Sequence, residues 1–310
     1  METNVEATTP MQMKNQGFKV WWQLLRPHTL TAGFVPVTIG TALALQDGEF
    51  NVLLFLAMLI ASLLIQAATN MFNEYYDYVR GLDNENSVGI GGAIVRDGVK
   101  PKTVLTIALS FFGIATLLGV YICMESSWWI AVIGLVCMLI AYLYTGGPYP
   151  IAYTPFGEIV SGLFMGLIII LLSFYIQTGT VTLESIVLSV PISILVGAIM
   201  LSNNIRDLDG DKENGRKTVA ILIGRKNAVF LLATMFTFSF AWIAGLAIMN
   251  ISSYWLLLVI LSAPKAYKAV TGFRGKTKPI EMMPAMKATA QTNTIFGFLL
   301  TIGIVVSTFI

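Results

Sequence analysis

Two short segments of the sequence place asparagine and aspartate four residues apart. The first contains Asn73 and Asp77, and the second contains Asn203, Asp207 and Asp211. If both segments are helical, the polar oxygens of each lie on one face, because residues four apart are neighbours on a helix. Amide and carboxylate oxygens without Cys or His suit Mg²⁺, which also binds waters and substrate phosphate oxygens. We therefore predict these five residues as metal ligands and the three aspartates as catalytic, since bound metal would neutralise a departing diphosphate.

Several charged residues flank the two motifs and could complete the same site. Gly81 allows the chain to turn after the first motif, so that Asp83 could return as a further metal ligand. Arg206 lies inside the second motif, and Arg96 and Lys212 lie in neighbouring polar segments. Guanidinium and ammonium groups bind phosphate oxygens well, so we expect these three basic residues to bind substrate. The alternative is that basic residues here only fix the topology of the chain.

The elements that must position these residues are apolar. The chain has 310 residues, of which 56% are hydrophobic and 12% charged, whereas a soluble protein carries about 25% charged residues. A helix needs roughly 20 apolar residues to cross a bilayer. Runs of this kind occur at about 29–46, 51–72, 103–123, 127–145, 157–177, 183–203, 227–249, 252–271 and 289–310. We predict an all-α polytopic membrane protein with about nine transmembrane helices, in which 29–310 form a single domain and 1–28 a cytoplasmic or interfacial segment.

The distribution of basic residues predicts the orientation of these helices. All 19 Lys and Arg residues lie before the first apolar run or at and after the second, sixth and eighth runs. The positive-inside rule then makes the N-terminus and these loops cytoplasmic. Both Asn/Asp motifs consequently fall at cytoplasmic ends of helices. Nucleic-acid binding is not expected, because the basic residues form no patch apart from these loops.

A weak internal repeat accompanies this topology. Asn73 and Asp77 follow the second apolar run, and Asn203 and Asp207 follow the sixth. This correspondence favours two four-helix halves with a ninth helix added. Coincidence is the alternative, because the residues around the two pairs do not align well.

The two motifs, the expected helices and the Arg26-Pro27 pair before the first helix resemble the UbiA superfamily of intramembrane prenyltransferases, over nearly the whole chain. The segment from Tyr144 to Glu158 and the start Arg26-Pro-His-Thr-Leu30 are most similar to the bacterial 1,4-dihydroxy-2-naphthoate polyprenyltransferases. The resemblance implies that Arg26 binds the diphosphate, that Tyr144 is a catalytic residue near the acceptor, and that Glu158 and Asn204 bind substrate. The family often carries a third acid at the position of Gly81, so Asp83 is the nearest candidate here.

The resemblance also implies a reaction and a location. A polyprenyl group would pass from an allylic polyprenyl diphosphate to 1,4-dihydroxy-2-naphthoate with loss of CO₂ and diphosphate, giving demethylmenaquinone in menaquinone biosynthesis. Mg²⁺ would be the cofactor, the lipid bilayer would surround the protein, and the site would face the cytoplasm at the bacterial plasma membrane. Other acceptors such as 4-hydroxybenzoate, haem or chlorophyllide stay open. A secondary transporter is a further alternative, although its ion-binding acids are expected near the midplane.

Overall fold

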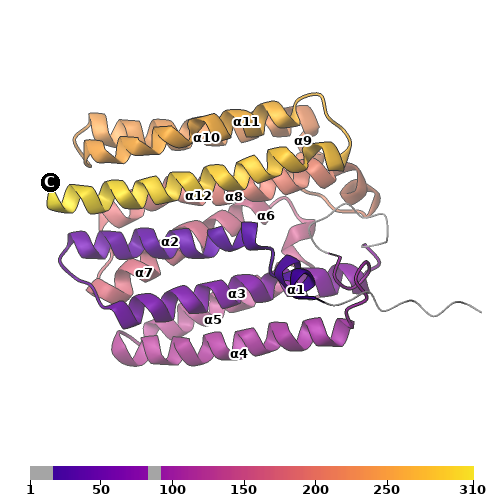
Figure 1. The fold of residues 1–310 in the computed structure, drawn as a ribbon, viewed down its shortest axis with the longest axis horizontal. Coiled ribbons are helices and arrows are strands. Elements are labelled where there is room, and N and C mark those ends of the chain that lie inside the picture. The colour runs from indigo at the N-terminus through magenta and orange to yellow at the C-terminus, as the bar shows by residue number, and fades with distance from the viewer. Residues whose placement is uncertain (1–16, 83–91) are drawn as a thin grey trace, which may run out of the picture.

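The structure, a computed structural model, describes residues 17–82 and 92–310, and every regular element in these ranges is a helix. The long helices run side by side in one bundle, with the short helices α1 and α9 at one end (Figure 1). The short elements are α1 (Phe18–Leu25), η1 (Ile151–Tyr153) and α9 (Val219–Ile223).

Eight helical segments in the described part of the chain are long and apolar enough to cross a membrane. They are α2 (Pro27–Gln46), α3 (Val52–Val79), α4 (Pro101–Glu125), α6–η2–α7 (Gly157–Ser161, Gly162–Ile168, Ile169–Thr178), α8 (Leu183–Glu213), α10 (Arg225–Ile248), η3–α11 (Tyr254–Ser262, Ala263–Phe273) and α12 (Pro279–Phe309). The fourth predicted span corresponds to α5 (Trp129–Leu143), an apolar helix of 15 residues that is shorter than the others. The all-α polytopic prediction is therefore confirmed, while the count of nine spans and their orientation stay predictions.

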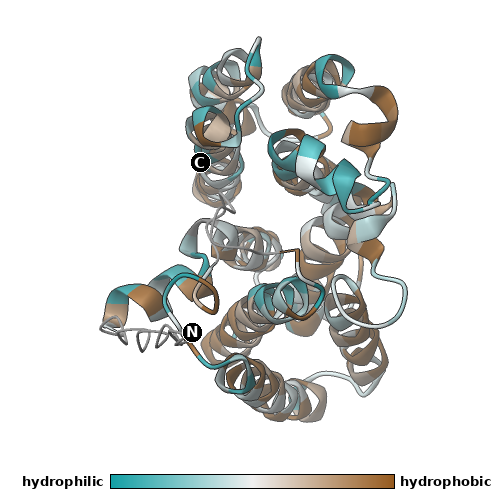
Figure 2. Ribbon diagram, turned by 90° about the vertical axis from the view of Figure 1, so that its right-hand side faces the viewer, coloured by the Kyte–Doolittle hydropathy of each residue, from teal (hydrophilic) through white to brown (hydrophobic). Residues whose placement is uncertain are grey.

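The outer surface of the bundle is apolar, as a lipid-facing surface must be. Leu117 of α4, Leu135 of α5 and Phe230 of α10 are 71%, 61% and 74% exposed. Figure 2 looks along the helices from the end that carries α1, and the teal hydrophilic residues gather at the near ends of the brown helices.

The two helices that carry the motifs are longer than their apolar runs. The sequence predicted ends near residues 72 and 203, but α3 continues to Val79 and α8 to Glu213. Hydropathy marks where a helix leaves an apolar environment, whereas the backbone hydrogen bonds can continue into the polar region. Both motifs are therefore helical, which confirms the assumption behind their shared faces.

The predicted interfacial segment forms α1 and lies at the motif-bearing end of the bundle (Figure 1). Val20 and Leu24 are buried against α3 and its neighbours, while Phe18 and Trp22 are exposed. The helix ends at Leu25, and the left-handed conformation of the next residue, Arg26 (φ 51°), turns the chain directly into α2.

Helix α8 packs closely against the π-helical segment η2. A Cβ atom at Gly162 or Gly166 would lie 2.4 or 2.3 Å from backbone atoms of Ser193 in α8. Small residues allow helices in a membrane to approach in this way. The contact fixes η2, several of whose side chains line the cavity described below.

Pro191 lies inside α8 and cannot donate the helical hydrogen bond to the carbonyl of Val187, four residues earlier. The indole Nε1 of Trp242 in α10 donates to this carbonyl at 2.8 Å. A neighbouring helix thus satisfies the backbone group that the proline leaves without its usual partner, as a low-dielectric environment requires.

We expect Trp242→Phe to lower the free energy of unfolding by about 1 kcal/mol, since it removes one interhelical hydrogen bond to a buried carbonyl. The loss should shrink in a Pro191→Ala background, where the residue at 191 regains an N–H for Val187. Denaturant unfolding in detergent of the four proteins of this cycle measures the coupling. The exposed Trp129→Phe serves as the control, and an equal cost of Trp242→Phe in both backgrounds would contradict this account.

Candidate active site

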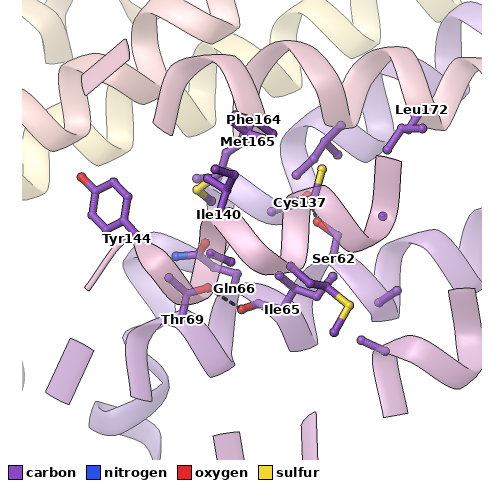
Figure 3. A pocket seen from close by; sticks show the side chains of 18 of the residues that line it. Ser62, Ile65, Gln66, Thr69, Cys137, Ile140, Tyr144, Phe164, Met165 and Leu172 are labelled. Atoms are coloured by element: carbon purple, nitrogen blue, oxygen red, sulfur yellow. Dashed lines mark hydrogen bonds between the residues drawn. The ribbon is translucent and has the colours of Figure 1, made fainter. Parts of the chain in front are cut away.

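A cavity of about 390 Å³ lies between α2, α3, α4, α5, η2 and α8. It follows the length of α5, because both Trp128 before this helix and Tyr144 after it line the cavity. Figure 3 shows Tyr144 at one side, Ser62, Gln66 and other residues of α3 below, and residues of η2 and α7 above. Most of the lining is apolar, so the cavity can hold a hydrocarbon chain and exclude water.

The two motifs lie at the same end of this cavity. Asn73 of α3 and Asn203 of α8 line it together with Arg26. Asp77 follows Asn73 on α3 and Asp211 lies near the end of α8; each turn of four residues advances the helix by about 6 Å. The amides thus line the cavity, and the carboxylates lie beyond it towards the end of the bundle.

Arg216 joins the two motifs directly. Its two Nη atoms lie 3.0 Å from Oδ1 of Asp77 and 3.0 Å from Oδ1 of Asp211. The side chains of Asp77, Asp211 and Arg216 are 14%, 11% and 15% exposed, so these ion pairs are mostly shielded from water. The structure therefore brings together two aspartates that the sequence placed far apart. Sequence reasoning did not select Arg216, because nothing in its spacing separates it from basic residues that only fix the topology.

The turn after α8 holds Arg216 in this position. Gly215 has a positive φ of 76°, which lets the chain fold back so that the N–H of Arg216 donates to the carbonyl of Asp211 at 3.0 Å. The guanidinium lies 4.8 Å from the ring centroid of Tyr153, in favourable cation–π contact. Burial would lower the pKa of Arg216, but the carboxylates of Asp211 and Asp77 outweigh it and raise the pKa, so the side chain stays charged.

Asp207 has a different arginine partner. Nε of Arg206 lies 2.6 Å from Oδ1 of Asp207, and the second guanidinium nitrogen contacts Oδ2. The remaining nitrogen of Arg206 contacts the sulfur atoms of Met283 and Met286 in α12. In this arrangement the predicted phosphate ligand Arg206 is mostly buried and connects α8 to α12. The neighbouring Asp209 is 65% exposed and pairs with Arg225.

Arg26 is held at the cavity by an acid that sequence reasoning did not select. Its Nη2 lies 3.5 Å from Oε2 of Glu74, whose side chain is 1% exposed. Oε1 of Glu74 accepts hydrogen bonds from the backbone N–H groups of Gly92 and Ile94 at 2.7 and 3.3 Å. Glu74 thus fixes both Arg26 and the segment after residue 91. Its position next to Asn73 was the available signal, but adjacent helical residues point in different directions.

The remaining candidates are distributed around this end of the bundle. Nδ2 of Asn204 donates to Oε1 of the buried Glu158 at 2.9 Å. Tyr144 lies close to the start of the same α6 helix, since a Cβ at Gly157 would be 3.0 Å from its hydroxyl oxygen. Lys212 is exposed on the last turn of α8.

Two further candidates lie in or near the segment between α3 and α4. Arg96 is exposed in the turn after Gly92, against which its guanidinium lies. Asp83 lies outside the described residues.

The donor set fits a hard cation, because carboxylate oxygens of α3 and α8 already converge on one positive group. Across residues 17–82 and 92–310, no three acidic, Cys or His side chains surround a common point. In this structure Arg216 lies between Asp77 and Asp211, and Arg206 pairs with Asp207. The six-residue metal set, with Asp83 included, stays a prediction.

Comparison with known proteins identifies relatives over almost the whole chain. The profile of the UbiA prenyltransferase family matches residues 33–289. The 1,4-dihydroxy-2-naphthoate octaprenyltransferase of Bacillus subtilis is 60% identical over 98% of this chain and 97% of its own length. The Escherichia coli protein of the same name is 28% identical over 93% of this chain and 96% of its own length.

Solved structures share the fold at low sequence identity. An apo UbiA homolog from Aeropyrum pernix K1 has a TM-score of 0.66 at 17% identity, covering 91% of this chain and 98% of its own. A UbiA homolog from Archaeoglobus fulgidus bound to DMAPP and Mg²⁺ has a TM-score of 0.62 at 16% identity, covering 91% and 99%. The helical architecture, the site at the ends of α3 and α8 and these relatives lead to one conclusion: the chain belongs to the UbiA prenyltransferase family.

Proposed function

We propose that this enzyme transfers a polyprenyl group from an allylic polyprenyl diphosphate to 1,4-dihydroxy-2-naphthoate; its 60% identical relative is named a 1,4-dihydroxy-2-naphthoate octaprenyltransferase. The observation that carries the proposal is the apolar cavity with the two Asn/Asp motifs at one end. A hydrocarbon tail fits the apolar part, and a charged head group fits the polar end. A water-soluble substrate pair would not need this combination.

The reaction can be written from these two ends. The allylic C–O bond breaks and its electron pair leaves with the diphosphate, while the carboxylate-bearing ring carbon of the acceptor attacks the allylic carbon. CO₂ then leaves and returns its bonding electrons to the ring, so the immediate product is the hydroquinone form of demethylmenaquinone. The apolar lining keeps water from the allylic cation.

The polar residues have separate tasks in this proposal. Mg²⁺ held by Asn73, Asp77, Asn203, Asp207 and Asp211, with Asp83 as a sixth candidate, would supply positive charge to the departing diphosphate. Arg26, kept at the cavity by Glu74, would bind diphosphate oxygens. Arg96, Arg206 and Lys212 are further candidates for these oxygens. On the acceptor side we assign Tyr144, Glu158 and Asn204, which lie close together at the same end.

We place this site on the cytoplasmic side of a bacterial plasma membrane. The basic residues of the loops support this orientation, and the B. subtilis relative supports a bacterial setting. The eight long apolar helices support a multi-pass protein with its cavity inside the bilayer.

The acceptor assay tests the proposal most directly. Purified protein with Mg²⁺, a polyprenyl diphosphate and 1,4-dihydroxy-2-naphthoate should release diphosphate and CO₂ in equal amounts. Chromatography of the lipid extract should show a prenylated naphthohydroquinone or its oxidised quinone. Turnover with 4-hydroxybenzoate and none with the naphthoate would reject this acceptor while leaving the prenyl transfer itself intact.

Mutation can distinguish the motif aspartates Asp77 and Asp211 from the nearby Asp209, which lies outside the predicted metal set. Asp77→Asn and Asp211→Asn should each lower kcat by at least about a hundredfold, as the loss of one preorganised charge-stabilising group does in other enzymes. Asp209→Asn is the matched control, because Asp209 lies on α8 like Asp211 but is 65% exposed and paired with Arg225. If all three variants had equal activity and unchanged thermal unfolding, the two motifs would not be part of the active site.

The orientation is tested by labelling single cysteines in intact cells. In a background with Cys123 and Cys137 replaced by serine, a membrane-impermeant maleimide should label a cysteine at the exposed Glu49 and should not label one at the exposed Lys226. The physical reason is the positive-inside rule, which puts the loop of Lys226 in the cytoplasm. If only the Lys226→Cys protein were labelled, the helices would have the opposite orientation in the membrane.

A further inference from the structure

We infer that Arg216 is a movable counter-cation, which neutralises Asp77 and Asp211 in the empty enzyme and transfers to the donor diphosphate when the metal and donor bind. This inference rests on the proposed function, because it needs a cation and a diphosphate at the same site. It assigns to Arg216 a role separate from those of the motif residues.

The first argument is electrostatic. The carboxylates of Asp77 and Asp211 both contact one guanidinium, at 3.0 Å each, and both are mostly buried. Two buried carboxylates that contact the same guanidinium are close enough to repel each other, and a cation between them offsets this repulsion. A metal bound by both motifs would supply that charge as well, so Arg216 and the metal compete for one position.

The second argument concerns the freedom of Arg216 to move. Arg216 lies in the segment that connects two helices and not within a helix. Helix α8 ends at Glu213, α9 begins at Val219, and Gly215 makes the turn between them. The ring of Tyr153 supports one face of the guanidinium and itself belongs to the η1 helix. The guanidinium can therefore turn on this ring while the carboxylates keep their places on α3 and α8.

The third argument is that Arg216 has another partner available once the donor is bound. A guanidinium binds phosphate oxygens in bidentate fashion about as well as it binds carboxylates. The polar end of the cavity, which Arg26, Asn73 and Asn203 line, is where the proposed function puts the diphosphate. When Arg216 leaves the two carboxylates, its ion pairs with the diphosphate replace the ones that it loses.

The consequence is a thermodynamic coupling between metal and donor. When metal binds alone, it must displace Arg216 from the carboxylates and leaves the guanidinium without a new partner. When donor and metal bind together, the diphosphate provides that partner. Each should therefore raise the affinity of the other, and the coupling must be reciprocal. Arg216 thus weakens metal binding in the absence of donor.

The test measures Mn²⁺ binding by electron paramagnetic resonance on the full-length protein in lipid nanodiscs, with geranyl thiodiphosphate as an uncleaved donor analogue. In the wild-type protein, the analogue should tighten Mn²⁺ binding by about fivefold or more, the lower range of typical couplings. Arg216→Gln should bind Mn²⁺ alone about fivefold more tightly, and the analogue should then tighten Mn²⁺ binding by a correspondingly smaller factor, because only its direct coordination of the metal remains. Arg216→Lys, which keeps the charge but cannot contact both carboxylates in the same way, should fall between the two.

Controls separate this role from a merely structural one. Arg225→Gln removes a similar pair at the exposed Asp209 and should behave like wild type. Without metal, Arg216→Gln should unfold at a lower temperature, and Mn²⁺ should restore the loss; a structural defect would not respond to metal.

Three outcomes would overturn the inference. They are unchanged or weaker Mn²⁺ binding by Arg216→Gln, an absence of coupling in wild type, and a stability loss that Mn²⁺ does not restore. If Mn²⁺ fails to bind the wild-type protein even with the analogue, the metal-dependent function falls together with the inference. Normal binding by wild type with no change in Arg216→Gln removes the inference alone.

Discussion

The arrangement of the polar site depends on the electrostatics of Asp77 and Asp211. These carboxylates come from α3 and α8, and burial at the end of the bundle makes their mutual repulsion costly. A cation between them is therefore a condition for the ends of the two helices to meet. In this structure the guanidinium of Arg216 meets that condition, and its ion pairs connect the first half of the chain to the second. These ion pairs lie beyond the polar end of the cavity, which Asn73 and Asn203 of the same two helices line.

The membrane-like interior imposes a second constraint, which is that backbone groups must find partners inside the protein. Long helices satisfy it along most of their length, and at one of the prolines that interrupt them, Pro191, the indole of Trp242 supplies the missing hydrogen bond. Close approach at Gly162 and Gly166 compensates for the weak driving force between apolar helices in lipid.

Charge and hydrocarbon are separated along one axis of the molecule. The apolar lining follows α5, while Arg26, Asn73 and Asn203 occupy the polar end and the aspartates lie beyond it. An amphiphilic donor can bind such a site in only one direction, so the reacting carbon falls at the boundary between the two regions. Glu74 lies inside the first motif but outside the predicted metal set, and it contributes to this boundary because it anchors Arg26 and the backbone at Gly92 and Ile94.

The sequence by itself determined the helical class, the apolar segments and the two Asn/Asp motifs. These properties are local: hydropathy follows from each run of side chains, and a spacing of four residues shares a face in any helix. The lengths of α3 and α8 were underestimated, since helical hydrogen bonding continues beyond the point where hydropathy falls. Which acid pairs with which base was decided only by the tertiary structure. Arg216, Glu74 and Arg206 became distinct from other charged residues when helices remote in sequence came together, because an ion pair depends on distance in space, which residue spacing along one chain does not contain.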